Sequence, residues 1–246
     1  MTTEKYVWET VQRSKTEAKN ALKEAFQAVG KMYNYGKVDA EFTAFRDFKV
    51  KWTRSYQWAD FTVSDYLNNA PMGVLEGLAE SLFSRISGRE PKPYTPEMND
   101  WITAPEFRDE KQPVYIRRSM NITRSAVGQY KDLDESLDRL KEKGLVAEDI
   151  APYLTWTKSP LQRNIGYAST LMDVIVISAG LDKKGSVSDT TLDLAVFREL
   201  QVIKDGWDNF GNTEYAEKVK SEDDFIEAYG EEEYESANGF LELMMD

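Results

Sequence analysis

The acid–base and metal-binding chemistry open to this 246-residue chain is limited by two absences, because the sequence contains no His and no Cys. A Ser-His-Asp triad and a Cys-His pair both need an imidazole, and ordinary zinc sites use at least one imidazole or thiolate ligand. A disulfide is excluded as well. A metal ion in this chain would therefore have oxygen ligands, which favour Mg²⁺, Ca²⁺ or Mn²⁺.

Carboxylates near the C-terminus are the side chains that could supply such ligands. One alternative that we keep is an active hydrolase with an oxygen-ligated divalent ion and Glu199 as the general base. The further carboxylates in that alternative are Asp205, Asp208, Glu214 and Glu217. The sequence contains no Gly-rich phosphate loop and no G-x-S-x-G motif, so no motif indicates a nucleotide-binding enzyme or a serine hydrolase.

The negative charge of the chain is concentrated at its C-terminal end. The whole sequence has 31 basic and 43 acidic residues, a formal net charge of −12. Residues 205–246 contain 14 acidic and two basic residues, so this segment supplies the entire imbalance. Such a run indicates either a solvated helical surface or a site for a cation or a basic protein. The charge argues against nucleic acid or an anionic membrane as a partner.

No segment of the sequence predicts a membrane span. The longest apolar candidate, Leu171 to Leu181, is interrupted by Asp173, and a span needs about 18 apolar residues. The N-terminus, Met1 to Lys5, is too polar for a signal peptide. We therefore expect a soluble, cytoplasmic protein.

The hydrophobic pattern of the first third predicts a helix, two strands and a second helix. Residues 4–30 are rich in helix formers with a loose helical period, which predicts a long amphipathic helix. Alternating aromatic and polar residues at 48–63 predict a pair of antiparallel strands with a turn near 53–56. Pro71 can begin a helix whose apolar spacing continues to Ile86.

The middle of the chain predicts mostly irregular structure. Residues 89–113 hold five of the eight prolines, which predicts a long surface loop. A short strand is expected at 114–116. Asp132 then begins a helix that ends at Gly144.

The last 100 residues predict strands, a core helix and acidic helices. Strands are expected at 153–156 and within 165–177, where Val174 to Ile177 is apolar on both faces and is expected to be covered on both sides. Ser188 can cap a central helix at about 188–204. Acidic helices complete the chain, and the whole pattern predicts the α+β class.

One segment of that central helix and the residues before it resemble zincin metallopeptidases of the gluzincin-like or SprT-like kind, in their soluble archaeal form. In that family a strand ending in I-S-x-x-L-D leads to a helix that bears H-E-L-x-H. This sequence has Ile177-Ser178-Ala179-Gly180-Leu181-Asp182 and then Arg198-Glu199-Leu200-Gln201-Val202. The resemblance covers about residues 42–208 and implies a zincin-like metallopeptidase fold with a small antiparallel or mixed sheet.

Five further phrases, in the same order as in that family, support the resemblance. They are Val50-Lys51-Trp52-Thr53-Arg54, Val63-Ser64-Asp65-Tyr66-Leu67, Leu82-Phe83-Ser84-Arg85-Ile86, Thr103-Ala104-Pro105-Glu106-Phe107 and Arg118-Ser119-Met120-Asn121-Ile122-Thr123.

The motif departs from the family where the zinc ligands should stand. The resemblance places the two imidazoles at Arg198 and Val202, and a guanidinium and a valine offer no lone pair to a metal. Glu199 keeps the position of the general base, but without zinc the water that it would deprotonate has a pKa near 15.7. The family's third ligand would fall near residues 209–215, which contain no His. The resemblance therefore implies the fold without the activity, and zinc is not an expected cofactor, whereas weak Mg²⁺, Ca²⁺ or Mn²⁺ binding stays open.

Arg198 has two interpretations. It could replace the lost metal charge and pair with Glu199 or with an acidic residue of the C-terminal segment, or it could point to solvent and pair with Asp205 or with nothing. For Glu199 the alternatives are an exposed helix residue and a buried ion pair. Both are left open by the sequence.

Two further features could bind a partner. A zincin's edge strand binds extended peptide by adding a strand to the sheet, so Val174, Val176 and Ser178 are expected as a peptide-binding edge. The aromatic residues of the predicted strand pair could form an exposed platform, but alternating aromatics on strands are usually core. These residues are Trp52, Tyr56, Trp58, Phe61 and Tyr66.

The sequence as a whole predicts three segments and a protein without zinc chemistry. The segments are a helical arm at 1–36, a zincin-like α+β domain at 37–210 and an acidic helical segment at 211–246 packed on that domain. We expect a degenerate zincin that keeps a scaffold or peptide-binding role toward an unknown protein or peptide. The alternatives are the oxygen-metal hydrolase and an acidic structural or interaction protein.

Overall fold

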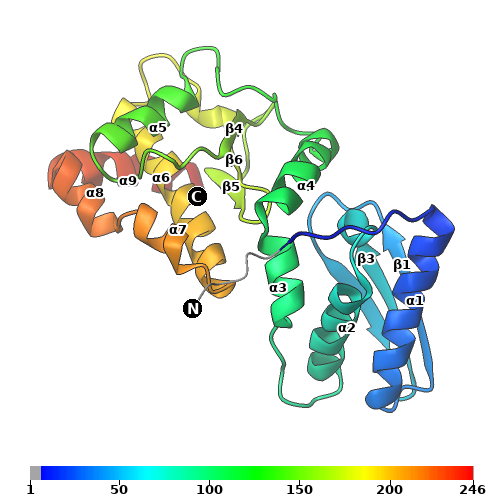
Figure 1. The fold of residues 1–246 in the computed structure, drawn as a ribbon. Helices are drawn as coiled ribbons and strands as arrows, with labels where there is room; N and C mark the ends of the chain where they lie inside the picture. Colours follow the sequence, from blue (N-terminus) through cyan, green and yellow to red (C-terminus); the bar gives the residue numbers. More distant parts are fainter. Residues whose placement is uncertain (1–6, 246) are drawn as a thin grey trace. The chain divides into compact units, whose positions relative to one another are not determined.

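The computed structural model describes residues 7–245, which fall into two units that join in the sequence between Arg118 and Ser119 (Figure 1). The polar start of the chain, Met1 to Lys5, and the first residues of the helix predicted at 4–30 lie outside the described residues. This division differs from the predicted segments, because the boundary falls inside the segment expected to be one domain at 37–210. Each unit combines helices with a three-stranded sheet, so the α+β class is confirmed.

Helix α1 (Lys15–Met32) begins later than predicted and belongs to the core of the first unit. Ser14 starts it with a capping box, in which its hydroxyl accepts from the Glu17 N–H while the Glu17 carboxylate accepts from the Ser14 N–H. The helix buries Leu22 and Phe26 against the sheet and a second helix. It is therefore not a separate arm.

The sheet of the first unit confirms the predicted antiparallel pair. Strand β2 (Val50–Arg54) runs antiparallel to β3 (Trp58–Ser64), and β1 (Lys37–Thr43) runs parallel to β3 on its other side. Alternate residues of β3 are buried, and the ring of Phe61 meets those of Phe26 and Phe83. The short 3₁₀ helix η1 (Asp65–Leu67) follows β3.

Helix α2 (Met72–Ile86) follows Pro71 as predicted, but the loop and strand expected after it are wrong. The structure has α3 (Pro96–Thr103) and α4 (Pro105–Arg118) there instead. Pro96 and Pro105 each occupy the first position of a helix, where the missing N–H costs nothing. Trp101 and Phe107 are fully buried. Burial of these rings accounts for helices in a proline-rich segment.

In the second unit, strand β6 (Val174–Ile177) is the centre of the sheet. It pairs in parallel with β4 (Tyr153–Trp156) and antiparallel with β5 (Gly166–Ser169). All four residues of β6 are buried, which confirms that the strand is covered on both sides. The 3₁₀ helix η2 (Ala179–Leu181) follows it.

Helix α6 (Asp189–Asn209) is the central helix of this unit and packs on β5 and β6 (Figure 1). It begins where predicted and extends about one turn beyond residue 204. Helix α5 (Leu133–Glu142) starts at Asp132, as predicted, and packs on α6. The acidic segment forms α7 (Thr213–Lys218), α8 (Glu222–Tyr229) and α9 (Glu231–Met245), of which α7 and α9 contact α6.

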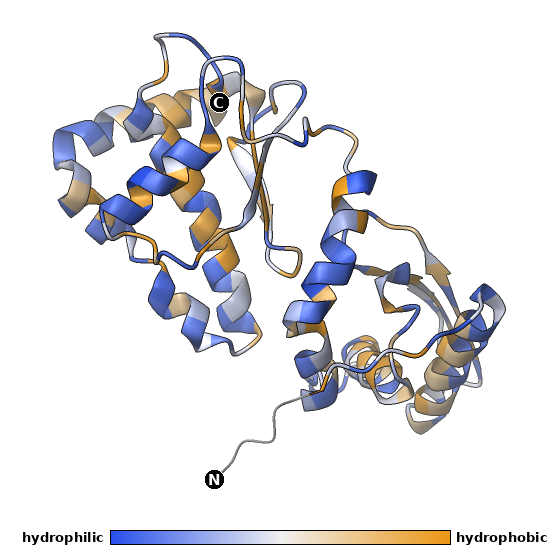
Figure 2. Cartoon of the chain, turned by 45° about the horizontal axis from the view of Figure 1, so that its top comes forward, coloured by the Kyte–Doolittle hydropathy of each residue, from blue (hydrophilic) through white to orange (hydrophobic). Residues whose placement is uncertain are grey.

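Hydrophobic and hydrophilic residues alternate along the helices of both units (Figure 2). The apolar stripes pack inside each unit, and no helix within the described residues is both long and apolar enough to cross a membrane.

Candidate functional site

The start of α6 fixes the position of the motif residues. The Ser188 hydroxyl accepts from the Thr191 N–H at 3.0 Å and so caps the helix. The following turns bury residues on nearly every side, among them Leu192, Ala195 and Leu200. A helix buried all round must lie in the middle of its unit. The side chains at 198, 199 and 202 therefore point to different surroundings.

Arg198 points toward the C-terminal helices. Its Nη2 donates to Oε1 of Glu222 at 2.7 Å and to Oδ1 of Asn238 at 2.9 Å. The Tyr234 hydroxyl donates to the same Glu222 oxygen at 2.9 Å. The prediction that Arg198 pairs with an acidic residue of the C-terminal segment agrees with this geometry, and the solvent-facing alternative with Asp205 is wrong.

The pair is held in a partly buried setting. The side chain of Arg198 is 26% exposed and that of Glu222 is 44% exposed. Burial raises the pKa of Glu222, but the hydrogen bonds from Arg198 and Tyr234 outweigh it and hold that pKa below its usual value. Glu222 is thus a carboxylate that balances the guanidinium.

Glu199 points the other way, toward strand β5. It is only 7% exposed, and its carboxylate lies so close to Gly166 that a Cβ on that glycine would approach Oε1 to 2.9 Å. Burial raises the pKa of Glu199 to about 7. No residue in the described part of the chain forms an ion pair with it. Both sequence alternatives for Glu199 are therefore wrong, because it is neither exposed nor ion-paired.

Val202 is 50% exposed and lies one turn beyond Arg198. Arg198, Glu199 and Val202 thus do not converge on one point. The family's zinc ion does not fit these residues, because Arg198 has no acceptor, is already bound to Glu222 and Asn238, and Val202 has only methyl groups.

The carboxylates of the oxygen-metal alternative are not brought together with Glu199. Among residues 7–245, no group of three or more carboxylates is placed to hold a metal ion. The other carboxylates of that alternative are exposed. They are those of Asp205, Asp208, Glu214 and Glu217. Residues 7–245 therefore do not bring together the donor set that this alternative requires.

The expected peptide-binding edge at Val174, Val176 and Ser178 is wrong. Strand β6 is central, so β4 and β5 already use the backbone groups that a peptide would need. The hydroxyl of Ser178 accepts from the N–H groups of Leu161 and Gly180 and thereby fixes the turn after the strand.

The structure confirms the core interpretation for only two of the five aromatic residues of the predicted strand pair. Phe61 and Tyr66 are buried, as the core interpretation predicts. Trp52, Tyr56 and Trp58 are exposed, which contradicts that interpretation. Trp52 lies on the edge strand β2 and is 47% exposed, and Tyr56 lies in the turn after it and is 94% exposed.

Asp193 is a buried residue that sequence reasoning missed. Its carboxylate accepts from Ser136 Oγ at 2.5 Å, from Nε and Nη2 of Arg139 at 2.9 and 2.7 Å, and from the Tyr229 hydroxyl at 2.8 Å. The hydrogen bonds to Asp193 raise the pKa of Arg139. An aspartate between Leu192 and Leu194 in a core stripe was the available signal, because a buried charge needs a partner.

The two ionic clusters have one structural effect in common. Asp193 joins α6 to α5 and α8, and Arg198 joins α6 to α8 and α9. Between them, Phe225 is fully buried with its ring 5.1 Å from that of Phe197. The acidic C-terminal helices are thus an integral part of the second unit.

Comparisons with protein-family models, with curated proteins and with solved structures give no match.

Proposed function

We propose that this chain is a catalytically degenerate zincin-like protein that acts as a scaffold rather than as a peptidase. The proposal rests on the order of the family phrases in the sequence and on the place of the motif in the second unit. Strand β6 leads through η2 to α6, and the motif glutamate, Glu199, faces the sheet. This order of strand, turn and helix is what the resemblance implies.

The observation that carries the proposal is the contact set of Arg198. At the position of a zinc ligand, this side chain binds Glu222 and Asn238 and so holds α8 and α9 on α6. A position that serves catalysis in the family serves packing of the C-terminal helices here. Glu199 keeps its place beside the sheet, but Arg198 and Val202 offer no ligand for a metal that would activate a water for it.

A cleavage assay tests the proposal. Casein or a mixed peptide library is incubated with the purified full chain and with Glu199→Gln, each with and without added Zn²⁺. We expect both proteins to match the protein-free blank. Zinc-dependent turnover by the wild type that is lost in Glu199→Gln would refute the scaffold role and restore an enzymatic one.

The surface of the C-terminal helices favours a second candidate function, binding of a basic protein. Residues 222–246 contain no Lys and no Arg, and exposed carboxylates follow one another at the start of α9. These are Glu231, Glu232 and Glu233. No Lys or Arg of the same helices neutralises this negative charge, so it can attract a basic surface.

Neutralising this surface tests the second candidate. The triple variant Glu231→Gln, Glu232→Gln, Glu233→Gln is compared with the matched triple variant Glu24→Gln, Glu76→Gln, Glu90→Gln, whose residues are exposed in the first unit. An immobilised oligolysine peptide serves as the probe. We expect the α9 triple variant to bind more weakly than the control triple. Equal weakening of the two would mean that only the net charge matters.

A further inference from the structure

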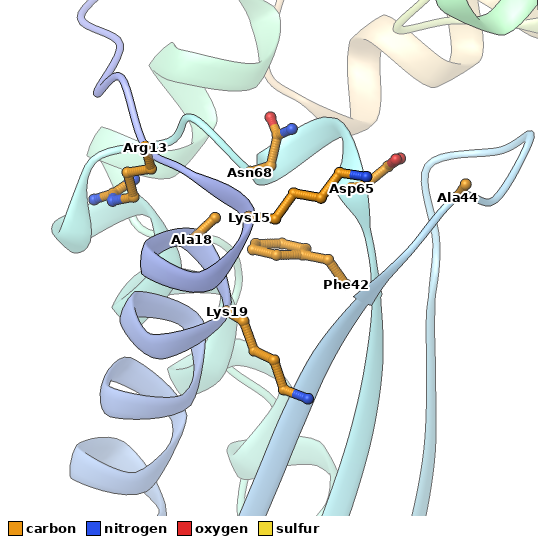
Figure 3. A pocket seen from close by; sticks show the side chains of 8 residues that line it. All are labelled: Arg13, Lys15, Ala18, Lys19, Phe42, Ala44, Asp65 and Asn68. Carbon is orange, nitrogen blue, oxygen red and sulfur yellow. The ribbon is translucent and has the colours of Figure 1, made fainter.

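A hollow of about 330 Å³ lies in the first unit, between the start of α1, the end of β1 and the residues that follow β3 (Figure 3). Three cationic side chains line it, those of Arg13, Lys15 and Lys19. The hollow belongs to the first unit alone and is independent of the residues of α6. It has no part in the proposed scaffold function.

The positive charges of this hollow are largely uncompensated. Lys15 forms no ion pair with any described residue, and Lys19 has only a 4.0 Å contact with the exposed Glu41. Arg13 donates one hydrogen bond to the Ala70 carbonyl oxygen at 2.6 Å, and its other guanidinium N–H groups remain as donors for a ligand. A chain with a net charge of −12 thus collects three cations at one concave place, and one of them, Lys15, has no ion-pair partner among the described residues.

The one acidic residue of the lining does not neutralise them. Asp65 is bound by Arg118 through two hydrogen bonds of 2.7 and 2.6 Å. Each of its oxygens accepts one of these bonds and the Arg118 guanidinium balances its charge, so the positive charge of Arg13, Lys15 and Lys19 is not cancelled by this pair. The amide of Asn68, at the rim, is an additional hydrogen-bonding group.

The floor of the hollow is apolar. The ring of Phe42 lies between the side chains of Lys15 and Lys19 in Figure 3, and Ala18 lies beside it. An aromatic ring in a hollow lined by cationic side chains suits a ligand that has a flat apolar part and an anionic group. The positive end of the α1 dipole adds to the attraction of the anion.

We propose that this hollow binds a small aromatic anion, a phosphate or carboxylate group attached to a flat ring. The ring packs on Phe42, and the anionic group accepts hydrogen bonds from Lys15 and from Arg13 or Lys19. Phosphate and carboxylate are both acceptors for these cations, so the probes must distinguish them.

A titration of the full-length chain tests the site. Phenyl phosphate, benzoate and inorganic phosphate are each added at low ionic strength while the amide signals are followed by NMR. We expect saturable binding of phenyl phosphate or benzoate, with shifts at Lys15, Lys19 and Phe42, and the tighter of the two identifies the anionic group. Equal affinity for inorganic phosphate would overturn the aromatic part of the proposal. No saturable binding of either aromatic anion would overturn the site itself.

Two matched lysine variants complete the test. Lys15→Gln removes an exposed cation from the hollow, and Lys31→Gln removes an exposed cation from the last turn of the same helix. We expect Lys15→Gln to raise the Kd of the bound anion by about fivefold, as for a partly exposed charge-assisted hydrogen bond. Lys31→Gln leaves the Kd unchanged. Equal losses in both variants would show attraction to general charge and would overturn the site.

Discussion

Arg198 on α6 donates to Oε1 of Glu222 on α8 at 2.7 Å, and the same guanidinium nitrogen reaches Asn238 on α9 at 2.9 Å. One side chain therefore joins three helices of the second unit. In the zincin-like role proposed above, its place in the sequence is that of a metal ligand. Removing the Arg198 side chain should therefore change the stability of the second unit rather than an activity.

We predict that Arg198→Ala lowers the free energy of unfolding of the second unit by about 1–2 kcal/mol, because Glu222 and Asn238 lose a partly buried partner. Arg198→Lys should retain part of this energy, since it keeps the charge but not the forked donors. Urea denaturation measures both. Lys184→Ala, an exposed cation in the same unit, is the control. A loss no larger than in that control would contradict the prediction.

Asp193 should matter more than Arg198, because it is fully buried and accepts four hydrogen bonds. We expect Asp193→Ala to cost about 3 kcal/mol, the usual result of removing one partner of a buried ion pair. Asp138→Ala removes an exposed carboxylate from the neighbouring α5 and should cost little. Thermal and urea unfolding give the comparison, and similar losses in the two variants would be the unexpected result.

Glu199 makes the stability of the chain depend on pH. Burial raises its pKa in the folded protein to about 7, from an ordinary value of 4.5. Between these values the folded chain holds a proton that the unfolded chain has lost, so the free energy of unfolding falls as the pH rises from about 4.5 to about 7. We predict that Glu199→Gln removes this fall and stabilises the protein at pH 8 by an amount on the order of 3 kcal/mol.

Urea denaturation of wild type and Glu199→Gln at pH 5 and pH 8 checks this dependence. The difference in free energy between the two proteins should be small at pH 5 and large at pH 8. Glu24→Gln, an exposed carboxyl of α1, should show no comparable difference. A Glu199→Gln effect that is the same at both pH values would contradict a buried, shifted carboxyl.

Trp52 and Phe61 are cross-strand partners in the register of β2 and β3, yet their burial differs widely. Trp52 is 47% exposed on the edge strand, whereas Phe61 is 2% exposed among the rings of the first unit. We predict that Phe61→Ala costs about 3–4 kcal/mol and that Trp52→Ala costs less than about 1 kcal/mol. Thermal unfolding decides this, and equal losses would mean that Trp52 has a packing partner.

Trp52 and Phe61 also show that a local sequence pattern predicts strands but not their positions in the sheet. Alternation correctly predicts the strands β2 and β3, because a pleated strand repeats every two residues. It does not say which strand is the edge of the sheet, since pairing depends on segments far away in the sequence. The same limit explains the error at Val174 and Ser178, where an apolar strand that was expected at the edge lies at the centre.

Proline content misled the prediction for residues 89–113 for a different reason. Pro96 and Pro105 start helices, and only the burial of Trp101 and Phe107 in the first unit reveals this. By contrast, Ser188 and Asp132 are caps with a local mechanism, and both helix starts were predicted correctly. The partners of Arg198 and Asp193 depend on tertiary packing of α5, α8 and α9. Only the need of a buried charge for a partner could be anticipated.

Zinc content of the purified full chain tests the central proposal most directly. The protein is dialysed against buffered Zn²⁺ near neutral pH, washed with a weak chelator, and its metal is measured per chain by mass spectrometry. We expect far less than one zinc per chain, with no difference between wild type and Glu199→Gln. One tightly held zinc per chain would contradict a degenerate site, whether or not Glu199→Gln retains it, because Glu199 holds the general-base position and not a ligand position.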